Sequence, residues 1–133
     1  MKTKELNDKE KENIIKQKRS ENKIISLLGF AAKAGRACFG TDKICDEIRR
    51  HGSNDEYSRF ISGIVIMSSD ISGNAQKRLV NCCRNYNAKC IKTDYTSETL
   101  GQKLGRSSDT VAVAVFDNTF KTALLKETDM IIH

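Results

Sequence analysis

The sequence has no tryptophan, few aromatic residues and no long apolar run, and each absence excludes a class of protein. A membrane-spanning helix needs about 20 apolar residues, whereas the longest apolar stretch here, residues 61–67, suits a buried strand. The first twenty residues are charged and lack the apolar segment of a secretory signal, so we expect a cytoplasmic protein without a membrane partner. Because the few aromatic residues mostly stand at core-like positions, we expect no stacking platform for single-stranded nucleic acid. Those core-like positions are Phe30, Phe60, Phe116 and Phe120.

Motifs of the common enzyme classes are missing as well. No glycine-rich nucleotide-binding fingerprint and no nucleophile elbow is present. The two histidines, His51 and His133, lie in no motif that would serve a nucleophile. We therefore expect a protein that is not an enzyme and has no catalytic residues and no cofactor.

The cysteine spacing indicates neither a disulfide framework nor a metal site. None of the five cysteines forms a Cys-x-x-Cys pair, and neither histidine stands at a ligand-like spacing from a cysteine. We expect small buried side chains in a reducing compartment and no metal. The adjacent pair Cys82–Cys83 leaves a thiol-based sensor open as an alternative. The five cysteines are Cys38, Cys45, Cys82, Cys83 and Cys90.

What the sequence does contain is a basic surplus on a chain of single-domain length. Its 133 residues carry 23 basic and 17 acidic side chains, which gives a formal net charge of +6. A basic balance favours an acidic partner, of which nucleic acid is the commonest.

Residues 1–22 differ in composition from the rest and form a charged N-terminal extension, followed by one domain over residues 23–133. Seven basic and five acidic residues crowd this segment. It is either an exposed helix that lengthens the next one or a disordered arm. In function it is either a solvated tail or a basic arm that adds phosphate contacts.

From residue 22 onward helices and strands are predicted to alternate. Helical spacing of apolar residues predicts a helix that stops near Gly35, and a second helix is predicted to be capped by Thr41 or Asp42. Buried strands are predicted at 60–67 and 110–116, with a shorter strand at 89–93. Ser72 is predicted to cap a third helix, a fourth helix is predicted to start at Thr96 or Ser97, and Asp117 or Asn118 is predicted to cap the last helix. This alternation predicts an α/β domain with helices on both faces of a central sheet.

Three loops combine glycine with serine or threonine where a helix begins or a strand starts, and the first and third also carry a basic residue. They span residues 39–43, 69–74 and 105–110, and Lys33 and Arg36 lie just upstream of the first. Glycine allows close approach of the backbone, and a helix N-terminus presents free N–H groups with a partial positive charge. In an α/β sandwich such loops can gather at one end and form a single surface.

Four segments of the chain stand in a characteristic order: KIISLLGFAAKAGRA (23–37), FGTDKICDEIRRH (39–51), IVIMSSDIS (64–72) and LGQKLGRSSDTVAVAV (100–115). Together they resemble the kink-turn RNA-binding ribosomal protein family, which includes archaeal ribosomal protein L-seven-Ae and eukaryotic ribosomal protein L-thirty-e. The similarity is greatest to its bacterial YlxQ-type branch. The resemblance implies a three-layer α/β/α sandwich around a mixed four-stranded sheet. It also implies a non-catalytic ribonucleoprotein component, monomeric when free, that binds structured RNA at tandem sheared G·A pairs, with ribosomal RNA of the large subunit as partner.

The family's RNA-contacting positions carry over onto the three loops and the residues just before them. Asp42, Lys43 and Asp46 depart from the asparagine, glutamate and lysine of many relatives, and Asp42 can only accept hydrogen bonds. Lys43 can instead donate to a guanine O6 or N7. Asp42 and Asp46 favour an alternative, a protein-interaction module that kept the fold and lost or altered kink-turn specificity. The candidate RNA-binding residues are Lys33, Arg36, Gly40, Thr41, Asp42, Lys43, Ile71, Ser72, Arg106, Ser107 and Ser108.

Overall fold

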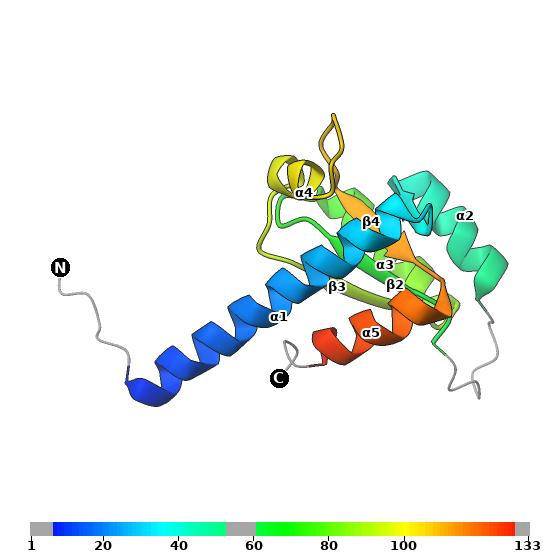
Figure 1. Ribbon diagram of the computed structural model, residues 1–133. Coiled ribbons are helices and arrows are strands. Elements are labelled where there is room, and N and C mark those ends of the chain that lie inside the picture. The colour runs from blue at the N-terminus through cyan, green and yellow to red at the C-terminus, as the bar shows by residue number, and fades with distance from the viewer. Residues whose placement is uncertain (1–6, 53–60, 130–133) are drawn as a thin grey trace.

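The computed structural model describes residues 7–52 and 61–129, which form an α/β domain of five helices and one four-stranded sheet within those residues (Figure 1). The helices are α1 (Asp8–Lys33), α2 (Thr41–His51), α3 (Gly73–Asn85), α4 (Ser97–Lys103) and α5 (Asn118–Thr128). The strands are β1 (Ala37–Phe39), β2 (Ile64–Met67), β3 (Lys89–Lys92) and β4 (Ala112–Val115).

Helix α1 is continuous over 26 residues, so residues 8–22 are helical and lengthen the helix that follows them. Asn7 caps it, because its side-chain oxygen accepts from the Glu10 N–H at 2.8 Å. The second half buries Ile24 and Leu28, whereas the first half runs away from the sheet (Figure 1). Phe30 does not belong to the core as its sequence position suggested, because this ring lies on the outer side of the helix and is 60% exposed.

The sheet has the strand order β1-β4-β2-β3 and is mixed. Strands β1 and β2 both run antiparallel to β4, while β3 runs parallel to β2. The two central strands are buried along their whole length, as their apolar and β-branched residues require. The three predicted strands correspond to β2, β3 and β4, and each is shorter than the sequence predicted. Phe60 lies outside the described residues.

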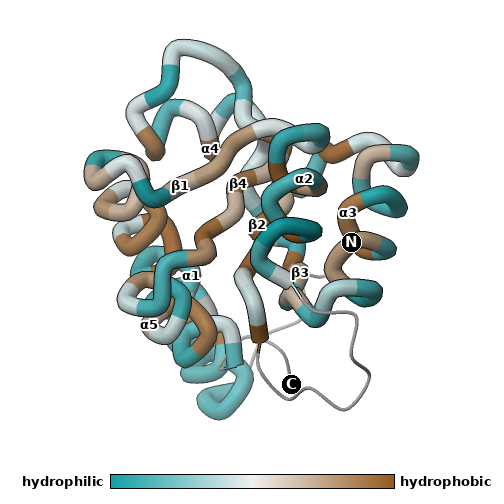
Figure 2. Tube along the Cα trace, turned by 90° about the vertical axis from the view of Figure 1, so that its right-hand side faces the viewer, coloured by the Kyte–Doolittle hydropathy of each residue, from teal (hydrophilic) through white to brown (hydrophobic). Residues whose placement is uncertain are grey.

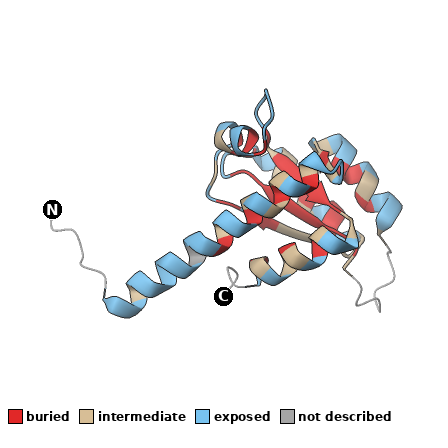
Figure 3. Cartoon of the chain, in the orientation of Figure 1, coloured by how far each residue is buried: buried red, intermediate tan, exposed pale blue. Residues whose placement is uncertain are grey.

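Helices cover both faces of the sheet, which makes the fold a three-layer α/β/α sandwich, as predicted. One core lies under α2 and α3, and the other lies under α1, α4 and α5 (Figure 3). Hydrophobic residues follow the strands and the helix sides that face them (Figure 2). Four cysteines are buried in the α2–α3 core and Cys90 is half-buried beside it.

Within the described ranges, no helix is long and apolar enough to cross a membrane. In the same part of the chain, no three histidine, cysteine or acidic side chains come together as a metal-binding group.

Candidate nucleic-acid interface

The sheet topology brings the three loops to one end of the molecule. The C-terminal ends of β1 and β2 lie beside the N-terminal end of β4, because Phe39 pairs with Val113 and Met67 pairs with Ala112. The loops 39–43, 69–74 and 105–110 continue from these strand ends. We call the surface they form the loop end.

The first loop starts α2 without a side-chain cap. Gly40 is the N-cap residue, with φ of +92° and ψ of 138°, and no side chain accepts from the first turn of the helix. The prediction that Thr41 or Asp42 caps this helix is therefore wrong, because Gly40 occupies the cap position and both residues lie inside the helix. This positive φ favours glycine, although a Cβ at this position would meet no atom within 4 Å. The N–H groups of the first turn of α2 thus lie open at the loop end.

The third loop packs onto the first through an arginine and an aromatic ring. The guanidinium carbon of Arg106 lies 3.7 Å from the centroid of the Phe39 ring, a cation–π contact between the two loops. Gly101 of α4 allows this loop to fold close, since a Cβ there would collide with the Ser108 carbonyl oxygen. Ser107 and Ser108 are exposed on the outer side of the loop.

A small pocket of about 140 Å³ lies between these two loops. Phe39, Gly40, Arg106, Asp109 and Thr110 contribute to its wall. Thr110 is 3% exposed, and its hydroxyl oxygen has no hydrogen-bond partner among the described residues. The pocket therefore offers one stacked guanidinium to a ligand.

The second loop is fixed by its own hydrogen bonds. The Asp70 carboxylate accepts from the Ser97 N–H at 2.8 Å and from the Ser97 hydroxyl at 2.9 Å, which ties the loop to the start of α4. The neighbouring Ser68 hydroxyl and then the hydrogen bonds from Ser97 lower the pKa of Asp70. The Ser72 hydroxyl oxygen accepts from the Ala75 N–H at 3.2 Å and so caps α3, as predicted. Ile71 is only 7% exposed and belongs to the α2–α3 core, which leaves its side chain little surface for a ligand.

Both unusual carboxylates of α2 are paired with arginines. Asp42 forms an ion pair with Arg78 of α3, and the Asp46 Oδ1 lies 3.4 Å from Arg49 Nη1. Both carboxylates are well exposed, so solvent screens these pairs and each contributes little to stability. Their effect is on the local charge, because each arginine offsets a carboxylate that would repel a phosphate.

The structure does not bring all the candidate residues together. Gly40, Thr41, Asp42 and Lys43 lie at the loop end, as do Ser72 and residues 106–108. Lys33 and Arg36 lie at the other end of β1, because Ala37 pairs with Val115. Arg36 lines a different hollow, which it shares with Lys43 and His51 of α2.

The solved structures that are similar to this fold include the following two. A Bacillus halodurans protein described as having unknown function superposes with a TM-score of 0.66 and 25% identity, over 80% of this chain and 97% of that one. A Giardia lamblia 15.5kD RNA binding protein superposes with a TM-score of 0.65 and 11% identity, over 85% of this chain and 88% of that one. No protein-family model and no curated protein sequence matches this chain. An RNA-binding protein therefore uses the same fold.

The candidate residues chosen from the sequence did not include Phe39, although it lies in the first loop, or Arg78 of α3, next to the loop end. The ring of Phe39 contacts the guanidinium of Arg106, and Arg78 forms an ion pair with Asp42. Both contacts join residues far apart in the chain, so no local pattern could have found the partners. The only available signal was an aromatic residue directly before a glycine at a helix start.

Proposed function

We propose that this chain is a non-catalytic RNA-binding protein whose loop end binds a structured, kink-turn-like RNA. On this proposal its partner is ribosomal RNA of the large subunit. The observation that carries the proposal is the stacking of Arg106 on Phe39, directly beside the open N-terminus of α2. It supports RNA binding because a stacked guanidinium holds its N–H edge toward solvent, where phosphates and base edges accept.

Three features of the loop end suit a bent RNA. The first turn of α2 offers backbone N–H groups to an anion or an acceptor. Lys43 stands in the same turn and has no ion-pair partner among the described residues. The pocket of about 140 Å³ between the loops is smaller than an ordinary small-molecule site. It suits one splayed nucleotide of an RNA rather than a larger free ligand.

A titration of the full chain with two RNAs tests this proposal. One RNA carries a kink-turn with tandem sheared G·A pairs, and the other is a straight control in which those pairs are Watson–Crick pairs. Fluorescence anisotropy is expected to give an affinity for the kinked RNA at least about tenfold higher, a difference of about 1.4 kcal/mol. Equal affinities, or no binding to either RNA, would contradict the proposal.

Variants locate the surface. Arg106→Ala and Lys43→Ala are each expected to weaken binding to the kinked RNA and to reduce the salt slope by roughly 0.7–0.9 for each phosphate that the variant no longer neutralises. Lys126→Ala is the control, because this exposed lysine belongs to α5 and lines a hollow between α1 and α5 instead of the loop end. Unchanged affinity in both loop variants would place the RNA elsewhere on the molecule.

The exposure of Asp42 and Asp46 favours a second candidate, a protein-interaction module on the same fold. Co-sedimentation of the chain with purified large ribosomal subunits, before and after removal of ribosomal proteins, separates the two candidates. Binding that survives on the stripped RNA supports RNA recognition. Binding only to the intact subunit, together with no affinity for the kinked RNA, supports the protein-interaction module.

A further inference from the structure

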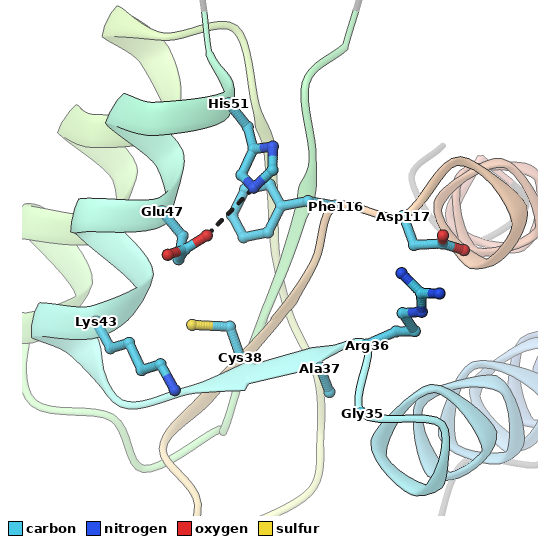
Figure 4. Close-up of a pocket in the computed structure, with 9 residues that line it drawn as sticks. All are labelled: Gly35, Arg36, Ala37, Cys38, Lys43, Glu47, His51, Phe116 and Asp117. Atoms are coloured by element: carbon cyan, nitrogen blue, oxygen red, sulfur yellow. Dashed lines mark hydrogen bonds and ion pairs between the residues drawn. The ribbon is translucent and has the colours of Figure 1, made fainter.

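A second hollow, with a volume of about 370 Å³, lies between β1 and α2, and we call it the β1–α2 pocket (Figure 4). Lys43, Glu47 and His51 point into it from one side of α2, where they follow one another at intervals of four residues. The opposite wall is formed by Cys38 of β1 and by Arg36, which directly precedes this strand. The volume falls within the range of pockets that hold small molecules, about 300–1,000 Å³.

One wall of the β1–α2 pocket is a pair of stacked rings. The imidazole of His51 and the phenyl ring of Phe116 lie 4.8 Å apart between centroids, at an interplanar angle of 15°. The His51 Nε2 lies 3.2 Å from the Glu47 carboxylate, which fixes the orientation of the imidazole. His51 is exposed, so a planar ligand can extend the stack. Histidine and phenylalanine are among the side chains on which nucleobases stack.

The cations of this pocket are available to a ligand, whereas its carboxylates are engaged. Among the described residues, the side chains of Arg36 and Lys43 form no hydrogen bond and no ion pair, although the Arg36 guanidinium faces the Asp117 carboxylate (Figure 4). Glu47 pairs with Arg50 at 3.3 Å as well as with His51. Asp117 caps α5, where its Oδ2 accepts from the Phe120 N–H at 3.4 Å. A ligand therefore meets two cations without an ion-pair partner among the described residues, one of them facing Asp117, beside an aromatic wall.

We propose that the β1–α2 pocket binds one nucleoside monophosphate unit, with the base against His51 and the phosphate between Arg36 and Lys43. The unit comes either from an unpaired nucleotide of a bound RNA or from a free mononucleotide. The RNA source rests on the proposed function. It is favoured by Lys43, which stands in the first turn of α2 and so borders both the loop end and this pocket.

The first arm of the test uses free ligands and the full chain. The four ribonucleoside 5′-monophosphates and the matching nucleosides are titrated separately, and the backbone amides of Arg36, Lys43, His51 and Phe116 are followed by ¹H–¹⁵N NMR. At least one monophosphate is expected to shift these signals saturably and to bind about tenfold more tightly than its nucleoside, because the phosphate adds hydrogen bonds to charged groups. Equal binding of nucleoside and monophosphate would overturn the role given to the two cations.

Matched variants test whether the monophosphate binds in the β1–α2 pocket. Arg36→Ala is expected to weaken monophosphate binding about tenfold, the loss typical of one hydrogen bond to a charged group. Arg84→Ala is the control, since this exposed arginine lies in the last turn of α3 and does not line the pocket. Equal loss in both variants would show a general charge effect and overturn the proposal.

The second arm uses the kinked RNA with and without a short unpaired 3′ extension. The extension is expected to tighten binding to the unaltered chain, and this gain is expected to vanish in Arg36→Ala and in His51→Ala. A gain only in this arm identifies the RNA as the source, and saturable binding only in the first arm identifies the free mononucleotide.

If the first arm gives no saturable shift and the extension gives no gain, the proposal that the β1–α2 pocket binds a nucleotide is overturned. In that case the binding of the unextended RNA still tests the proposed function. Conversely, a chain that binds a monophosphate but no kinked RNA retains the pocket and loses the proposed function.

Discussion

Helices α2 and α3 lie side by side on one face of the sheet and both begin at the loop end, but their first turns are built differently. Helix α3 starts from Ser72, whose hydroxyl oxygen accepts from the Ala75 N–H. Helix α2 starts from Gly40, which has no side chain and a φ of +92°. The four other described helices are all capped by a side chain, so the open start of α2 stands out. The start of α3 therefore contributes to stability, whereas the start of α2 leaves N–H groups for a partner outside the molecule.

Substituting Gly40 is expected to have the largest effect on this comparison. Gly40→Ala forces a Cβ onto a backbone conformation that non-glycine residues rarely adopt, with an expected loss of about 1–3 kcal/mol in the free energy of unfolding. Because relief of that strain re-orients the start of α2, affinity for the kinked RNA is expected to fall as well. Urea denaturation and fluorescence anisotropy measure the two quantities.

Gly73→Ala is the matched control, because this glycine is the first residue of α3 and a Cβ there would meet no atom within 4 Å. Its substitution is expected to leave stability unchanged or slightly raised, since alanine lowers the entropy of the unfolded chain. Similar losses in Gly40→Ala and Gly73→Ala would contradict the assigned difference between the two helix starts.

Removing the cap of α3 is expected to have the next largest effect on stability. Ser72→Ala is expected to lower the free energy of unfolding by about 1 kcal/mol. Thr41→Ala is the comparison on α2, and its cost is expected to stay within about 0.5 kcal/mol because Thr41 caps nothing. If Thr41→Ala cost as much as Ser72→Ala in urea denaturation, the assignment of Gly40 as the cap would be wrong.

The starts of α2 and α3 also show which features of the fold can be predicted from the sequence. Ser72 is predicted as a cap because serine precedes an apolar helical pattern, and the local rule holds. At residues 40–42 the same rule selects Thr41 or Asp42, but the positive φ of Gly40 makes the glycine the cap. The alternation of helices and strands is also predicted correctly. Like the cap at Ser72, it depends on local properties of the sequence, namely the spacing of apolar residues and the position of turn residues.

The contacts of the candidate site were not predictable, because they depend on how distant segments meet. Arg106 and Phe39 come together only when β1 pairs with β4, and Asp42 meets Arg78 only when α2 packs on α3. Arg36, by contrast, is close to Gly40 in sequence but not in space. The three residues of β1 lie between them and carry Arg36 to the other end of the sheet.

The charge at the open start of α2 offers a smaller change. Asp42→Asn removes the carboxylate that pairs with Arg78 and frees that arginine for a phosphate. We expect a several-fold gain in RNA affinity at low salt that shrinks as salt is added, with a stability loss below about 1 kcal/mol because the pair is exposed. Asp129→Asn is the control, since that carboxylate pairs with Lys89 at the C-terminal end of α5. A gain of the same size in both variants would mean that net charge alone controls binding.

The smallest expected effect concerns the loop before α3 and depends on pH. The neighbouring Ser68 hydroxyl and the hydrogen bonds from Ser97 hold the pKa of Asp70 below its ordinary value of 3.8, so they stabilise the ionised carboxylate in the folded state. That contribution is present above pH 3.8 and is lost as the pH falls through the lower, folded-state pKa. Thermal melting of Asp70→Asn and of the unaltered chain is therefore expected to differ near neutral pH and to converge in acid. A difference that stays constant down to about pH 2 would show that Asp70 acts through shape and not through its charge.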